Sequence, residues 1–149
     1  MRYWRDTKAF LPFLASPVAP SAVKRPFLTA SGDFFMTTSD SLPLVAILRG
    51  VTPDDVLVHM AELYRAGFTQ VEIPLNSPNW QQSIVLAVKH YGDRMRIGAG
   101  TVTTPREVAI LKEAGCEFIL TPNTDISVIK AATSAGMATC IGCLTASEA

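Results

Sequence analysis

The sequence predicts an α/β fold with a parallel sheet, because strand-like apolar runs alternate with helical runs from residue 42 onward. A second observation is that a glycine follows each helical run. Successive glycines lie 25, 23 and 21 residues apart, at Gly67, Gly92, Gly115 and Gly136. Each is expected to take the left-handed conformation that ends a helix. The pattern predicts four copies of one strand–helix unit, followed by a fifth strand.

The elements follow one another in a regular order. We expect strands at residues 44–50, 70–75, 96–102, 117–122 and 138–144, and helices at residues 53–66, 79–91, 105–114 and 126–135. Two helices share a start signal: Thr52-Pro53-Asp54-Asp55 and Thr104-Pro105-Arg106-Glu107 each place a hydroxyl before a first-turn proline, with a carboxylate at the third position. Ser77-Pro78 is expected to open the second helix similarly.

The repeat length favours one architecture. A strand–helix repeat of about 25 residues is compact and suits a (β/α)8 barrel. Four and a half units are present, so we expect a half-barrel, with residues 145–149 resembling the capped first turn of a fifth helix. The alternative is an open, flavodoxin-like sheet of five parallel strands.

Residues 1–40 differ in character from the domain predicted at residues 41–149. They contain scattered aromatic residues and several prolines, without a sustained helical or strand period, and are predicted to be a disordered extension. Asp6 is the only acidic residue before Asp33, as in an organellar transit peptide, but an Arg-rich amphipathic helix is lacking. The simpler interpretation is an upstream extension, with Met36 as the natural start.

Composition excludes several functional classes. Thirteen basic and 13 acidic residues give zero formal charge, which argues against nucleic-acid binding, and no apolar run approaches the roughly 20 residues that span a membrane. Three cysteines argue against a disulfide framework and favour a reducing, cytoplasmic compartment. Cys140-Ile-Gly-Cys143 could be half of a redox or metal site. We interpret the pair instead as small buried residues of a strand, because strand positions three apart face opposite sides.

Candidate site residues stand where the predicted strands end, since parallel α/β folds bind ligands there. They are Arg49, Glu72, Asn76, Thr101, Thr121 and Asn123. Only Arg49 and Glu72 are charged, and Glu72 interrupts an apolar run, so we expect the two to pair within a cavity. The alternatives are a plain buried salt bridge for this pair, and turn or cap roles for Thr101, Thr121 and Asn123.

Gly98-Ala-Gly100 lies inside a predicted strand and lacks the third glycine of a dinucleotide fingerprint. Glycine within a strand suggests close approach of a ligand or of a facing side chain. His59 and His90 fall within helices, at no metal-ligand spacing, and are expected to be surface or packing residues. No metal site and no cofactor are predicted.

Several runs resemble one known family: LPLVAILRG, VEIPLNSP, IGAGTV, FILTPN and the final TASEA. Across residues 42–149 the chain resembles the aldolases of 2-dehydro-3-deoxy-6-phosphogluconate and 2-dehydro-3-deoxy-6-phosphogalactonate, and its motifs are more similar to those of the galactonate branch. The resemblance implies a homotrimeric class I aldolase of carbohydrate metabolism, which binds a phosphorylated keto acid through a lysine Schiff base and releases pyruvate and glyceraldehyde 3-phosphate. It further implies that Glu72 is the general acid/base, Arg49 binds the substrate carboxylate and Thr101 contacts substrate.

One departure from the family concerns the Schiff-base lysine. The resemblance implies a lysine on the sixth strand, beyond residue 149, whereas this chain has Lys8, Lys24, Lys89, Lys112 and Lys130, in the extension or in predicted helices. We therefore expect the chain alone to be inactive. The alternative function is a non-catalytic half-barrel that binds a small keto acid or a protein partner.

Overall fold

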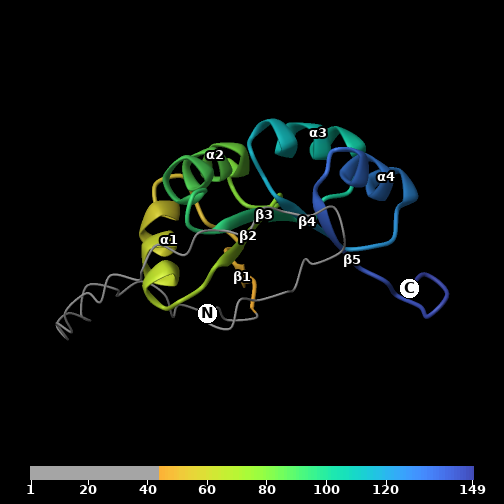
Figure 1. The fold of residues 1–149 in the computed structure, drawn as a ribbon, viewed down its shortest axis with the longest axis horizontal. Coiled ribbons are helices and arrows are strands. Elements are labelled where there is room, and N and C mark those ends of the chain that lie inside the picture. The colour runs from red at the N-terminus through yellow and green to blue at the C-terminus, as the bar shows by residue number, and fades with distance from the viewer. Residues whose placement is uncertain (1–43) are drawn as a thin grey trace.

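A computed structural model describes residues 44–149, in which five strands alternate with four helices (Figure 1). The predicted extension at residues 1–40 lies outside the described residues, so its predicted disorder is untested.

All five strands form one parallel sheet in chain order. They are β1 (Ala46–Ile47), β2 (Gln70–Pro74), β3 (Arg96–Gly100), β4 (Phe118–Thr121) and β5 (Ala138–Ile141), and each pairs with the strand before it. The order confirms the predicted strand–helix units. The predicted strands were too long at their ends; β1 keeps only two residues because Arg49 and Gly50 already form a turn.

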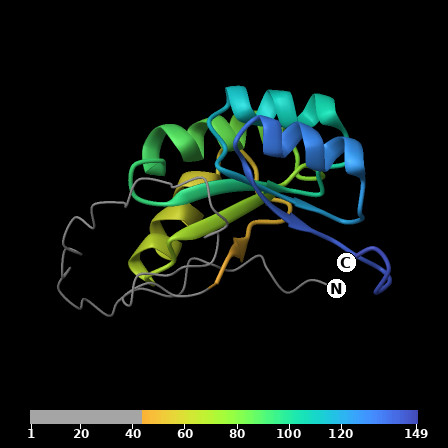
Figure 2. The same ribbon diagram turned by 45° about the vertical axis from the view of Figure 1, so that its right-hand side comes forward.

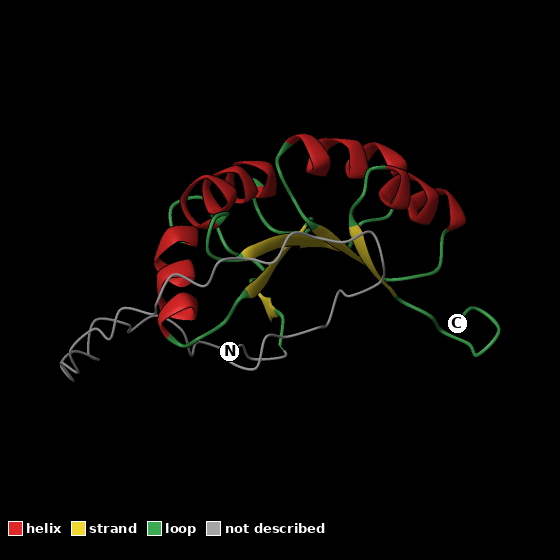
Figure 3. Ribbon diagram, in the orientation of Figure 1, coloured by secondary structure: helices red, strands yellow, loops and turns green. Residues whose placement is uncertain are grey.

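The helices lie on one side of the sheet. They are α1 (Val56–Arg65), α2 (Trp80–Tyr91), α3 (Pro105–Glu113) and α4 (Ile126–Ser134). Figures 1 and 3 show them following one another along an arc, with the sheet curving beneath them. A flavodoxin-like sheet would carry helices on both faces and would not keep its strands in chain order. The arrangement is therefore an arc of a (β/α)8 barrel wall, and the open-sheet alternative is wrong.

Alternate strand residues separate two faces of this arc. Val71, Ile73, Ile97, Ala99 and Ile119 belong to the core between sheet and helices. The residues between them lie on the opposite face of the sheet, which is turned away from the helices. We call it the concave face; it lies below the helices in Figure 2. One row of paired residues crosses this face from β1 to β5: Ile47, Glu72, Gly98, Phe118 and Ala138.

The predicted capping motif forms only at α3, whereas α4 begins at Ile126 as predicted. At α3 the Thr104 hydroxyl accepts a hydrogen bond from the Glu107 N–H, while the Glu107 carboxylate accepts from the Thr104 N–H at 2.9 Å. At α1, Thr52 instead donates its hydroxyl to the Asp55 side chain at 2.8 Å, and no side chain caps the helix. At α2 the N-cap is Asn79, with φ 50°, rather than Ser77. The predicted N-caps of α1 and α2 were wrong because an extra turn precedes each helix.

Helix ends follow the prediction at three of four glycines. Gly67, Gly115 and Gly136 have φ of 88°, 88° and 67°, the left-handed conformation. Gly92 has φ −58°, so the prediction was wrong there. The N–H groups of Arg94 and Met95 both donate to the Tyr91 carbonyl, so the chain leaves α2 through a further right-handed turn.

Candidate active site

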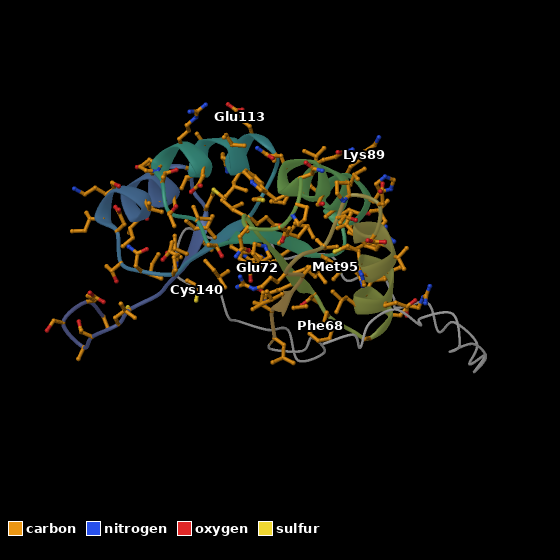
Figure 4. All side chains as sticks on the ribbon, turned by 180° about the vertical axis from the view of Figure 1, so that it is seen from behind. Phe68, Glu72, Lys89, Met95, Glu113 and Cys140 are labelled. Carbon is orange, nitrogen blue, oxygen red and sulfur yellow. The ribbon has the colours of Figure 1, made fainter. Side chains whose placement is uncertain are left out.

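Glu72 lies at the middle of β2 on the concave face, and only 3% of its surface is exposed. Figure 4 labels it on the side of the sheet opposite the helices, whereas Lys89 and Glu113 lie on the outer side of the helices. Burial raises the pKa of the Glu72 carboxyl above its ordinary value, and the Arg49 charge lowers it by less. No described residue donates a hydrogen bond to this carboxylate. Glu72 is therefore a buried acid with its polar atoms uncommitted among the described residues.

Two glycines of β3 make room for side chains of the neighbouring strands. A Cβ placed on Gly100 would lie 1.5 Å from Glu72 Oε1, and one placed on Gly98 would lie 2.2 Å from the Phe118 ring. The carboxylate of β2 and the ring of β4 therefore each lie over a glycine of the strand between them. This confirms that glycine in this strand permits the close approach of a facing side chain.

Arg49 follows β1 in an exposed turn. No ion pair between Arg49 and Glu72 forms among the described residues, so the expected direct pairing and the plain buried salt bridge are both wrong. Arg49 affects Glu72 through its charge. The backbone beside Arg49 is held at Gly50, which has φ 79° and whose N–H donates to the Ser77 hydroxyl oxygen at 3.0 Å. That hydrogen bond ties the loop after β1 to the loop after β2.

Thr101 ends β3 in a strained conformation. Its φ of 60° lies in the left-handed region, which is costly for a β-branched residue. The backbone on both sides is held, because Leu75 N–H donates to the Gly100 carbonyl at 2.8 Å and Val102 N–H donates to the Leu120 carbonyl at 3.1 Å. Strain of this kind is found at functional sites more often than elsewhere. It singles out Thr101 among the hydroxyl residues at this edge.

Turn chemistry accounts for Thr121. Its hydroxyl donates to the Asn123 carbonyl at 2.8 Å and accepts from the Gly142 N–H at 3.3 Å, which joins the loop after β4 to the end of β5. Asn76 and Asn123 are exposed in the loops after β2 and β4. Sequence reasoning missed Ser77, although its place directly after the VEIPLN run was a usable signal.

The cysteines differ from the prediction. Cys140 and Cys143 are exposed rather than buried, because Cys143 lies beyond β5 and β5 is the last strand of the described sheet. Cys116 is buried. In the part of the chain that the structure describes, no group of His, Cys, Asp and Glu residues could hold a metal ion. His59 and His90 are exposed on α1 and α2, as expected.

Lys89, Lys112 and Lys130 are exposed on α2, α3 and α4, the helices that cover the convex side. None of the three projects from the strand edge that carries Glu72.

Across residues 44–149, no helix combines the length and apolar character that a membrane crossing needs.

Comparisons with known proteins agree with this arrangement. The family model "KDPG and KHG aldolase" matches residues 36–149. The 2-dehydro-3-deoxy-6-phosphogalactonate aldolase of Escherichia coli (strain K12) is 53% identical over 114 residues, which cover 76% of this chain and 56% of that protein. A probable 2-dehydro-3-deoxy-6-phosphogalactonate aldolase of Rhizobium meliloti is 43% identical over 72% of this chain and 50% of that protein. The chain thus spans about half the length of the curated relatives it matches.

A solved structure described as native KDPGal is 52% identical, with a TM-score of 0.72, over 76% of this chain and 55% of that one. The similarity holds in three dimensions as well as in sequence.

Proposed function

The chain belongs to the KDPG and KHG aldolase family, and on that basis we propose that it is the glutamate-bearing part of a class I aldolase that cleaves 2-dehydro-3-deoxy-6-phosphogalactonate to pyruvate and glyceraldehyde 3-phosphate. The observation that carries the proposal is Glu72, a buried carboxyl on the concave face with its pKa raised by burial. The specific substrate follows the E. coli relative, which is named for it.

Glu72 suits the proton transfers that an aldolase of this class requires. The carbinolamine must be protonated before it loses water to give the imine, and the substrate hydroxyl must lose its proton as the carbon–carbon bond breaks. The enamine that remains must then gain a proton to become the pyruvate imine. One carboxyl can perform these steps in turn if its pKa is raised toward the working pH, which burial favours here.

Arg49 and Thr101 are proposed to bind the substrate. An arginine side chain can hold a carboxylate through two parallel hydrogen bonds, and Arg49 is exposed in the loop that borders Glu72. Thr101 follows Gly100, over which the Glu72 carboxylate lies, so its hydroxyl is proposed to contact the same substrate. The keto carbon would then be bound near Glu72.

The imine-forming lysine is proposed to come from a part of the family barrel that these 149 residues do not cover. The described lysines lie on helices, on the wrong side of the sheet for this role. A related structure, KDPG aldolase from Legionella pneumophila, is described with pyruvate captured as a covalent carbinolamine; it is 25% identical with a TM-score of 0.66, over 73% of this chain and 52% of that one. The 149 residues alone are therefore proposed to be inactive. In line with the family resemblance, we further propose that the whole enzyme is a cytoplasmic homotrimer.

Borohydride trapping with pyruvate tests the proposal. Residues 36–149 would be exchanged for the matching part of the E. coli aldolase, giving a full-length chimera, and the 149-residue chain would be treated in parallel. We expect a stoichiometric pyruvyl adduct and substrate cleavage in the chimera, and no adduct in the chain alone. A stoichiometric adduct on Lys89, Lys112 or Lys130 would contradict the proposed lysine. A chimera that folds but does not cleave the substrate would favour a non-catalytic keto-acid or protein-binding role.

A further inference from the structure

We propose that Gly100 is a positioning residue, whose missing side chain leaves the space in which the Glu72 carboxylate lies on the concave face. The three atoms nearest to a Cβ built on Gly100 all belong to Glu72: Oε1 at 1.5 Å, Cδ at 2.3 Å and Cγ at 3.1 Å. Apart from the chain neighbours of Gly100, no atom of the described residues lies closer to this point than these three. The space is thus filled by the one side chain to which the mechanism assigns proton transfer.

Phe118 explains why the carboxylate lies over Gly100 rather than over Gly98. In the sheet register Glu72 pairs with Gly98, and Gly100 pairs with Pro74. The space over Gly98 is already taken, because a Cβ there would lie 2.2 to 2.5 Å from three atoms of the Phe118 ring. Phe118 approaches from β4, where it also pairs with Gly98. The ring therefore leaves the Glu72 side chain the position nearer the carboxyl end of β3.

Because Phe118 covers Gly98 and Glu72 covers Gly100, the carboxylate lies toward the carboxyl ends of the strands, where substrate would bind. A ligand at the carboxyl ends of the strands would meet Glu72 beside Thr101, which directly follows Gly100. With a smaller side chain at 118, or with a side chain at 100, the carboxylate would have a different position to occupy. The catalytic consequence rests on the proposed aldolase function, whereas the positioning itself does not.

Strand β3 cannot easily move away from a side chain at position 100. The Gly100 carbonyl accepts the Leu75 N–H at 2.8 Å, and the next residue is held with φ 60°. The end of a glutamate side chain, in contrast, rotates readily. Gly100→Ala should therefore displace the carboxylate and leave the sheet in place. Its effect should be mainly on the chemistry of Glu72 and only slightly on folding.

Carboxyl carbon NMR titration of the 149-residue chain, labelled at glutamate and assigned with E72Q, tests the positioning directly. In G100A the carboxylate should move toward solvent, and the titration midpoint of Glu72 should fall toward the range usual for glutamate. Ala99→Gly is the matched control, since it changes one methyl group on the opposite face of the same strand. It should leave the Glu72 midpoint unchanged. An unchanged midpoint in G100A, or an equal fall in A99G, would overturn the proposal.

Folding provides a second measurement. If G100A prevents folding while the double variant E72A/G100A folds, the conflict is between the new methyl group and Glu72, as proposed. If both variants fail to fold, the glycine is required by the backbone and the proposal is wrong.

The full-length chimera then measures the catalytic consequence. In it, G100A should lower kcat about 100-fold with KM little changed, since misplacing a general acid/base costs on this order. A99G should keep kcat near that of the parent chimera, and a kcat in G100A equal to that of A99G would overturn the catalytic role of Gly100. An inactive parent chimera would instead contradict the proposed function, while the Glu72 titration would still decide the positioning.

Discussion

Arg49 and Glu72 act on each other through charge without forming an ion pair. Burial raises the pKa of the Glu72 carboxyl, and the Arg49 guanidinium opposes that shift without cancelling it. A carboxyl in this state is easier to protonate in the folded chain than in the unfolded chain. Folding stability and protonation of Glu72 are therefore linked.

Glu72→Gln should make the chain more stable at neutral pH. Because the folded-state pKa is raised, the carboxyl contributes its stability fully below the unfolded pKa, and that contribution is lost as the pH rises through the folded value. Urea unfolding from pH 4 to pH 8 should show E72Q exceeding the wild type at pH 8, with the difference shrinking toward pH 4. E113Q, which alters an exposed carboxylate on α3, serves as the control. Equal pH dependence in E72Q and wild type would contradict this.

Arg49→Met should raise the pKa of Glu72 further, because the opposing positive charge is removed. The loss of stability with rising pH should then extend to higher pH than in the wild type. Arg49→Lys keeps the charge and should resemble the wild type in this measurement. A profile in R49M identical to that of R49K would show that the two residues do not interact.

Thr101→Gly should stabilise the fold by about 1 kcal/mol, because glycine takes a positive φ without the steric cost that a β-branched residue incurs. In the full-length chimera the same change should weaken substrate binding, seen as a higher KM. Thr101→Val keeps the β-branched shape without the hydroxyl, so it should lose binding without gaining stability. Destabilisation by T101G would show that the threonine conformation is not strained.

Thr104→Ala should destabilise the chain by about 1 kcal/mol, because the hydroxyl accepts the Glu107 N–H at the start of α3. Thr104→Ser should keep most of that stability. Thr52→Ala is the informative comparison, since the Thr52 hydroxyl donates a hydrogen bond to the Asp55 side chain and caps no helix N–H. Chemical denaturation should give T52A the smaller loss, and equal losses would mean that α1 is capped as the sequence first indicated.

Cys116 should resist thiol reagents in the native chain. Burial and the nearby Glu117 charge raise the pKa of its thiol to about 12, whereas Cys140 and Cys143 are exposed. A disulfide-exchange reagent at pH 8 should label two thiols quickly, and the third only after denaturation. Cys116→Ala should leave the number of quickly labelled thiols at two. If only one thiol of that variant were labelled quickly, the burial of Cys116 would be contradicted.

Sequence periodicity was enough to predict the strand–helix units, since alternating apolar runs and glycine punctuation are local signals. It also placed Glu72 on a buried strand, because the apolar residues around it predict the strand and Glu72 is the single acid within that run. What it could not predict depends on partners distant in sequence. The Thr52 and Thr104 motifs look alike, yet only Thr104 has its carboxylate partner one helical turn into a helix. Likewise, nothing near Gly100 in sequence shows that Glu72 fills the space above it.

The chain order of the strands has a consequence for synthesis on the ribosome. Each strand pairs with the strand that precedes it, so every pairing closes a single strand–helix–strand segment. Residues nearer the amino terminus leave the ribosome first, and each completed unit can dock on a sheet that already exists. Glu72 would acquire its neighbour Gly100 only when β3 has emerged and paired with β2. Its carboxylate would settle over Gly100 only once β4 has brought Phe118 over Gly98, so the candidate acid would be in place before β5 is available.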